Sequence, residues 1–277
     1  MLIHAGYEMS CACAQSTPML LILSVHPSRI NDLVSLDRVQ FAPAVPVNTY
    51  HDSFGNFCHV IEAPMGPLTM STDFIMRCNG LPDDVAPHAV QHALCDLPVD
   101  VLIFLLGSRY CETDRLSNIA WSLFGHSPKG WPLVQAICDF VHAHITFDYA
   151  HASPLKTAYD AYVQRTGVCR DFAHLAITLC RCMNIPARYC TGYLGDIGVP
   201  ADPAPMDFSA WFEVYLGERW YTFDARHNTP RIGRILMARG RDATDVALMT
   251  SFGQSTLTAF NVKTREVPDG RHAGFMK

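Results

Sequence analysis

The stretch Thr166-Gly167-Val168-Cys169-Arg170-Asp171-Phe172-Ala173 places a cysteine where a glycine interrupts one pattern and a helix begins. Cys169 is therefore predicted in the first turn of that helix. The unpaired amides and the dipole of a helix N-terminus favour an anion, so the position suits a thiolate nucleophile. The same amides could hold an oxyanion during acyl transfer. The helical spacing is carried by Phe172, Ala176, Leu179, Cys180 and Met183, and Pro186 ends the helix.

Two strands after this helix are predicted to form a hairpin. Residues 209–216 and 220–225 are rich in aromatic and β-branched side chains, which favour strands. Gly217-Glu218 between them suits a two-residue type II′ loop, which prefers glycine first. This loop length predicts that Leu216 pairs with Arg219. A three-residue loop would instead place the Asp224 side chain on the opposite face of the hairpin.

The same register brings two polar residues together. It pairs Trp211 with Asp224 and makes Ser209 a diagonal neighbour of Asp224, with Cβ atoms on the order of 7 Å apart. Asp224 could orient an imidazole and stabilise its cation. It could equally cap the turn before Arg226-His227-Asn228, and the spacing alone does not choose between these roles.

The rest of the chain predicts an α+β protein of two domains. Short apolar runs separated by turn clusters make residues 1–112 a β-rich domain, a sandwich or barrel. The apolar run 19–25 is too short to span a bilayer and lacks a basic leader, so a buried strand is expected. Helical spacing in residues 116–124 and 131–144 begins the second domain, which is predicted over residues 113–277.

Composition excludes several classes of function. The chain has 277 residues and a net charge of −5, which gives no basic face for nucleic acid. Eleven cysteines, an odd number without regular spacing, favour a reducing cytoplasm over a disulfide framework. Cys and His show no recurring ligand-pair spacing, so neither zinc nor another cofactor is expected.

Three blocks together resemble the transglutaminase-like superfamily: residues 166–173, 210–214 and 220–224. The resemblance is closest to a bacterial branch described as cysteine proteases, in which a β-rich region precedes the core. It implies a papain-like, transglutaminase-like core and a Cys-His-Asp triad that transfers acyl groups through a thiol. Cys169 and Asp224 match the cysteine and the aspartate of that triad.

Ser209 stands at the position of the family histidine, directly before the Ala-Trp pair. A serine hydroxyl cannot take a proton from a thiol near neutral pH, and a general base contributes typically ~10²–10⁴-fold in rate. Another histidine could fill this role, and His151, His174 and His227 are the candidates. His174 lies roughly 140° around its helix from Cys169. A surface or core location is the favoured interpretation for His174 and His227.

Two classes of function follow. The first is a cysteine protease or amidase that acts on peptide or isopeptide bonds, with activity weakened or lost at Ser209. The second is a non-catalytic relative that binds a peptide or another ligand in the same cleft. Arylamine acetyl transfer needs the same histidine and gains no support.

Arg226, Arg231 and Arg234 could hold a substrate carboxylate, although an exposed basic loop is the favoured interpretation. Partners are expected to be peptides or proteins, without nucleic acid or membrane.

Overall fold

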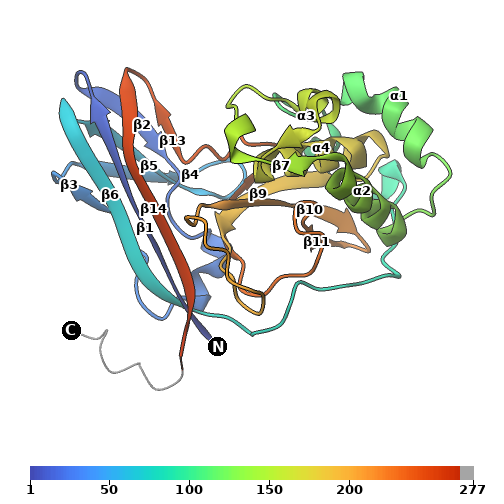
Figure 1. Ribbon diagram of the computed structural model, residues 1–277, viewed down its shortest axis with the longest axis horizontal. Helices are drawn as coiled ribbons and strands as arrows, with labels where there is room; N and C mark the ends of the chain where they lie inside the picture. Colours follow the sequence, from blue (N-terminus) through green and yellow to red (C-terminus); the bar gives the residue numbers. More distant parts are fainter. Residues whose placement is uncertain (269–277) are drawn as a thin grey trace.

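The computed structural model describes residues 1–268. Figure 1 shows a strand-rich half, which contains the N-terminus and the last strand, beside a half that carries the four α-helices. The sheets are antiparallel apart from one short parallel pair. The predicted α+β class, with a strand-rich region before a transglutaminase-like core, is confirmed.

Two four-stranded sheets form the strand-rich half, in the orders β14-β1-β6-β3 and β13-β2-β5-β4. On β1, Ile3, Ala5 and Tyr7 are buried in the apolar cluster between the sheets, as alternation on a strand requires. The predicted buried strand in 19–25 corresponds to β2 and the buried residues after it. The strands are β1 (Leu2–Cys13), β2 (Thr17–Leu21), β3 (Gln40–Ala42), β4 (Val47–His51), β5 (Phe57–Ala63), β6 (Gly66–Arg77), β13 (Met249–Ser251) and β14 (Ser255–Val267).

The C-terminal strands belong to the sheets of the N-terminal half. β14 runs antiparallel to the whole of β1, from the pair Leu2–Val267 to the pair Cys13–Ser255, and β13 pairs with β2. The division into domains after residue 112 stays a prediction, but the hydrogen-bonded sheets extend across it. Periodicity identifies a strand without identifying its partner, which is why the sequence did not indicate this pairing.

A third four-stranded sheet, of order β11-β10-β9-β12, packs against helix α4 in the other half. Every residue of α4 from Asp171 to Cys182 is buried, so this helix lies at the centre of the core. The predicted helices 116–124 and 131–144 are confirmed as α1 and α2. The elements are α1 (Thr113–Phe124), α2 (Trp131–His144), α3 (Ala158–Gln164), α4 (Cys169–Cys182), β7 (Thr146–Phe147), β8 (Thr166–Gly167), β9 (Ala187–Tyr193), β10 (Ser209–Leu216), β11 (Arg219–Phe223) and β12 (Ile235–Gly240), with 3₁₀ turns η1 (Pro27–Asp32), η2 (Leu94–Asp96), η3 (Leu102–Leu105) and η4 (Tyr149–His151).

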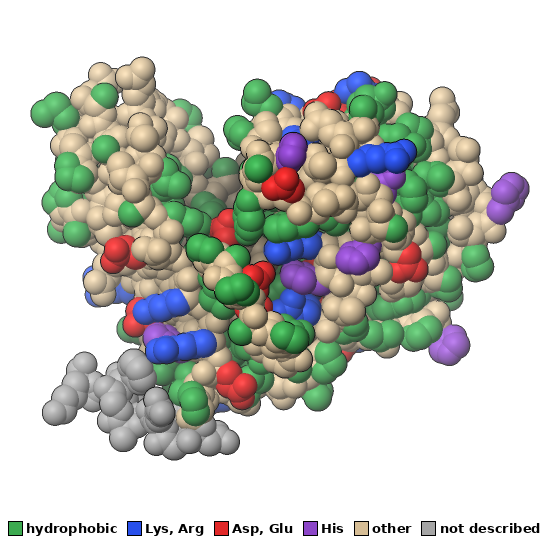
Figure 2. Space-filling model, viewed as in Figure 1, with side chains coloured by type: hydrophobic (Ala, Val, Ile, Leu, Met, Phe, Trp, Pro, Cys, Tyr) green, Lys and Arg blue, Asp and Glu red, His purple; other side chains and the backbone are tan. Residues whose placement is uncertain are grey.

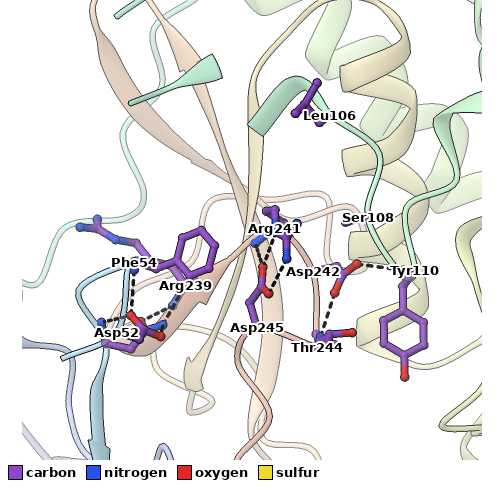
Figure 3. Close-up of polar contacts among 12 residues, drawn as sticks. Asp52, Phe54, Leu106, Ser108, Tyr110, Arg239, Arg241, Asp242, Thr244 and Asp245 are labelled. Atoms are coloured by element: carbon purple, nitrogen blue, oxygen red, sulfur yellow. Dashed lines mark hydrogen bonds and ion pairs between the residues drawn. The ribbon is translucent and has the colours of Figure 1, made fainter. Parts of the chain in front are cut away.

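The end of β12 and the loop after it form hydrogen bonds with segments on both sides. Arg239 N–H donates to Asn56 Oδ1 at 2.9 Å, and Asn56 Nδ2 donates to the Arg239 carbonyl at 2.8 Å. Three residues later, the Asp242 carboxylate accepts the Tyr110 N–H at 2.8 Å. Figure 3 shows Asp52, at the hairpin tip of the strand-rich half, on one side of this segment and Tyr110 on the other. The segment therefore holds the sheet that carries the candidate site against the strand-rich half and against the loop that contains Tyr110.

Candidate active site

The N-terminus of α4 is built around a buried carboxylate. Cys169 is the first residue of the helix and is partly exposed. Asp171 is fully buried and accepts the Val168 N–H at 2.9 Å, so it caps its own helix. A Cβ atom on Gly167 would lie 2.5 Å from Asp171 Oδ2. Glycine is therefore required for this close approach, whereas the sequence suggested only that it breaks the preceding pattern.

The Cys169 thiol is neutral at physiological pH. Burial raises its pKa to about 11, and the nearby Asp207 and Asp224 carboxylates add to the rise. The Arg226 guanidinium and a hydrogen bond from the Ala210 backbone amide act in the opposite direction without cancelling it. This contradicts the expectation that the helix N-terminus would hold a thiolate. Nucleophilic attack by this sulfur therefore needs a base to remove the proton.

The hairpin has the predicted register and a different turn. Leu216 pairs with Arg219, as the two-residue loop requires. Gly217 and Glu218 both have positive φ, 52° and 66°, which makes the turn type I′ and not the predicted type II′. The Glu218 N–H donates to His92 Nε2 at 3.0 Å, so a contact with a distant segment helps to stabilise the left-handed glutamate.

Asp224 performs both of the roles that the sequence left open. It follows the last paired residue of β11, and its side chain is only 3% exposed. Its Oδ1 caps a turn by accepting the Arg226 and His227 backbone N–H groups, each at 3.0 Å. Its Oδ2 accepts the His227 Nδ1–H at 2.9 Å. The carboxylate thus holds an imidazole, and that imidazole comes from its own turn.

Arg234 holds this carboxylate in its ionised form. Arg234 Nη2 donates to Asp224 Oδ2 at 2.9 Å, and Arg234 Nε donates to Asp83 Oδ2, also at 2.9 Å. Burial alone would raise the pKa of Asp224, but Arg234 and His227 outweigh burial and keep the pKa well below its usual range. Asp224 is therefore an anion at neutral pH and can stabilise an imidazolium.

Helix α2 fixes the turn that carries His227. Gln135 Nε2 donates to Asn228 Oδ1 at 3.0 Å, and Asn228 Nδ2 donates to Asp139 Oδ1 at 2.8 Å. His142 Nδ1 donates to the Arg226 carbonyl at 2.9 Å. These three α2 residues occur at helical spacing on one face. That polar stripe is the sequence signal that the prediction did not use.

His227 lines a small cavity together with Ser209. The cavity has a volume of about 80 Å³, and Tyr149, Asp207 and Arg226 also contribute to its wall. Figure 2 shows basic, acidic and histidine side chains gathered where the strand-rich half meets the helical half. The His227 side chain is 24% exposed, so it is partly accessible from this cavity, and whether it acts in the site stays a prediction.

The other two candidate histidines, His174 and His151, do not line this cavity. His174 is fully buried in α4, and its Nε2 accepts the Ala243 N–H at 3.2 Å. Burial lowers the pKa of His174 to about 3, so it is a neutral core residue, as expected. His151 is exposed and donates from Nδ1 to Asp148 at 2.8 Å.

The three arginines do not form an exposed basic loop, which corrects that interpretation. The side chains of Arg231 and Arg234 are only 5% and 7% exposed. The Arg226 guanidinium lies 3.8 Å from the centre of the Phe147 ring. Tertiary contacts bury these charges next to acidic partners, which the local sequence could not indicate.

Within residues 1–268, no group of three or more His, Cys, Asp and Glu side chains could hold a metal ion. The same residues contain no helix that is both long enough and apolar enough to cross a membrane. The cysteines all lie within this range, and each is a free thiol.

A cysteine at the start of a buried central helix, beside a hairpin that ends in an aspartate, defines a papain-like, transglutaminase-like core. The profile of the transglutaminase-like superfamily matches residues 123–225, and this chain belongs to that superfamily. The match includes Cys169, Ser209 and Asp224 and ends two residues before His227.

Individual relatives extend the similarity beyond the core. An uncharacterized protein of Mycobacterium tuberculosis is 30% identical over 227 residues, which cover 72% of this chain and 69% of that protein. An uncharacterized protein of Mycobacterium leprae is 25% identical over 240 residues, 79% of this chain and 81% of that one. The crystal structure of a putative cysteine protease from Cytophaga hutchinsonii superposes with a TM-score of 0.80 and 27% identity, over 96% of this chain and 90% of that chain. That similarity includes the strand-rich half.

Proposed function

We propose that this protein is a cysteine-dependent acyl-transfer enzyme, a peptidase or amidase that cleaves peptide or isopeptide bonds, with His227 in place of the family histidine. The observation that carries the proposal is the 2.9 Å hydrogen bond between His227 Nδ1 and Asp224 Oδ2. It is supported by the cavity that His227 shares with Ser209, the residue at the family histidine position.

In the proposed reaction, His227 acts as base and then as acid. Its Nδ1–H is held by Asp224, which leaves Nε2 as the ring nitrogen that would accept the proton of the Cys169 thiol as the sulfur attacks the substrate carbonyl. The C–N bond then breaks, the imidazolium gives its proton to the leaving amine, and an acyl-thioester remains. Water attacks the thioester, loses its proton to His227 and releases the acid, while the thiol regains its proton. Backbone amides at the start of α4 would stabilise the oxyanion.

The electrostatics support this assignment of roles. A thiol with a pKa of about 11 is a poor nucleophile until its proton is removed. An ionised Asp224 beside the imidazole stabilises the cation that forms when the imidazole takes that proton. The substrate is proposed to be a peptide segment, and no cofactor takes part in this chemistry. A cytoplasmic location is also part of the proposal, supported by free thiols at every cysteine.

An exchange of the histidine between two positions tests the proposal. The activity of the full chain would be measured by mass spectrometry on a pool of unfolded proteins, with and without hydroxylamine as an acyl acceptor. Cys169→Ser should abolish product formation. His227→Ala should lower the rate by about 10²–10⁴-fold. The double variant His227→Ala with Ser209→His should recover part of it, because it restores the family position.

His126→Ala serves as the matched control, because this histidine is exposed and outside the site, and it should act like the unmodified protein. A His227→Ala variant with undiminished activity would refute the role of His227.

The non-catalytic alternative has one specific observation in its favour, which is the raised pKa of the Cys169 thiol. It predicts no product with the unmodified protein. It also predicts that iodoacetamide, followed by peptide mapping, labels Cys169 more slowly than the exposed Cys95 at every pH up to 9. Labelling of Cys169 that falls in His227→Ala would instead favour the enzyme.

A further inference from the structure

A second cavity lies on the opposite face of the sheet from α4. Its volume is about 620 Å³, and Trp211 and Glu213 of β10 line it. Their neighbours along the strand, Phe212 and Val214, pack into the α4 core, so alternation places this cavity on the face of the sheet turned away from that core. Six arginines from separate parts of the chain line it: Arg29, Arg77, Arg219, Arg231, Arg234 and Arg239.

Positive charge exceeds negative charge in this cavity. Its wall contains six arginines against four carboxylates, Asp32, Asp83, Asp84 and Glu213, although the whole chain has a net charge of −5. Each carboxylate already has a cationic partner. The pairs are Arg29–Asp32, Arg234–Asp83, Arg219–Asp84 and Arg188–Glu213. The excess charge is therefore not neutralised by the acids of the wall.

Arg231 pairs with Asp196, which does not line the cavity, so Arg77 and Arg239 are the two arginines of the wall without an ion pair in the described part of the chain. Among residues 1–268, neither guanidinium makes a hydrogen bond or an ion pair with another side chain or carbonyl. Arg239 is half-buried, and burial lowers the pKa of Arg239, which the neighbouring Arg188 lowers further. The Glu213 carboxylate, which already pairs with Arg188, is the nearby anion that offsets these effects at Arg239. Because neither Arg77 nor Arg239 has an anion of the described chain bound directly to its guanidinium, an added anion could bind both.

We propose that this cavity binds a small polyanion, a compound that carries phosphate groups or several carboxylates, with Arg77 and Arg239 as ligands. The planar fork of a guanidinium matches the oxygens of both groups. The volume falls within the range of roughly 300–1,000 Å³ that is usual for small-molecule sites. The Trp211 and Trp220 side chains, which also line the cavity, would flank the ligand. The proposal is independent of turnover at Cys169.

Calorimetric titration of the full chain with pyrophosphate and, separately, with citrate tests the site, against sodium chloride at equal ionic strength. Saturable binding of at least one of these anions is expected. Tight binding of pyrophosphate alone identifies phosphate compounds as the ligand class, and binding of citrate alone identifies polycarboxylates. Arg77→Gln and Arg239→Gln should each weaken binding about tenfold or more, because each removes charge-assisted hydrogen bonds.

Arg115→Gln is the matched control, an exposed arginine on α1 outside the cavity, and it should bind as the unmodified chain does. Arg77 is exposed, so its variant keeps the test valid even if Arg239→Gln does not fold. The proposal is overturned if neither anion binds beyond the effect of chloride. It is also overturned if Arg77→Gln binds as tightly as the unmodified protein, or if Arg115→Gln loses binding to the same extent.

Discussion

Asp224 is the side chain on which the candidate site depends. It receives hydrogen bonds from two backbone amides, from His227 and from Arg234. An aspartate bound only to a turn would have a structural role, and one bound only to an imidazole would have an orienting role. Because Oδ1 and Oδ2 accept from different groups, one residue serves both roles at once.

The stabilising effect of Asp224 is expected to depend on pH. Its native pKa lies below that of an unfolded carboxyl, about 3.9. Its contribution is therefore fully present above about pH 4 and is lost as the pH falls through the native pKa. Asp224→Asn leaves Arg234 without this anion, which should cost about 3–5 kcal/mol at pH 7. Urea unfolding at pH 7 and pH 3 should show the difference from the unmodified chain shrinking at the lower pH.

Asp100→Asn, at an exposed aspartate, is the control for this measurement and should change the free energy of unfolding little. A gap between Asp224→Asn and the unmodified chain that widens toward pH 3 would contradict the assignment of a depressed pKa.

Helix α4 places Cys169 through contacts made on both sides of its first turn. Asp171 caps the helix, and Gly167 allows the carboxylate to approach the backbone. Gly167→Ala should therefore push Asp171 out of position, with a cost of about 1–3 kcal/mol in the free energy of unfolding. It should also slow the labelling of Cys169 by iodoacetamide. If the free energy of unfolding and the labelling rate of Cys169 both equal those of the unmodified chain within error, the cap tolerates a methyl group at residue 167.

His174, on the same helix, is expected to make the protein sensitive to mild acid. Its native pKa of about 3 lies below the unfolded value of about 6.5, so the unfolded chain takes up the proton first. Stability is thus lost as the pH falls from about 6.5 toward 3. Between pH 7 and pH 5 this residue should account for about 2 kcal/mol of that loss.

The variant His174→Phe should be less stable at pH 7, because the Ala243 N–H loses its acceptor. It should nevertheless lose less stability between pH 7 and pH 5, as chemical unfolding at the two values would reveal. His88→Gln, at an exposed histidine, should keep the pH dependence of the unmodified chain. An equally steep loss in His174→Phe would assign the acid sensitivity to other groups.

Strand β14, near the end of the described chain, pairs with β1 at its beginning. This strand covers one edge of the sheet along the whole length of β1, and Gly195 approaches it so closely that an added Cβ would lie 2.6 Å from the Thr264 carbonyl oxygen. The strand-rich half is therefore completed only after the helical half has been made, and the two are expected to unfold together.

Removal of residues 254–277 should consequently destabilise both halves, because β1 loses its partner and exposes an unpaired edge. Circular dichroism during heating should show one transition for the full chain and loss of helix signal at lower temperature for the shortened chain. A chain that ends at Pro268 keeps every strand of that sheet and is the control. An unchanged helix transition in the shortened chain would show that the halves fold independently.

Local pattern alone predicted the helix that starts at Cys169, the register of the hairpin and the α+β class. These features depend on residues close together in the chain, through helical periodicity and the length of a turn. The family position of Ser209 and the aspartate that follows β11 were also visible in the sequence.

The three-residue spacing allowed His227 to reach Asp224, but contacts of the turn with α2 and of Asp224 with Arg234 decided that it does so. The tertiary structure also decided that Cys169 is a neutral thiol, since burial depends on every element that packs around the helix. The pairing of β14 with β1 and the cavity lined by arginines likewise depend on residues distant in the chain. Short-range periodicity carries no information about such contacts, which is the physical reason that the sequence left the base of the site undetermined.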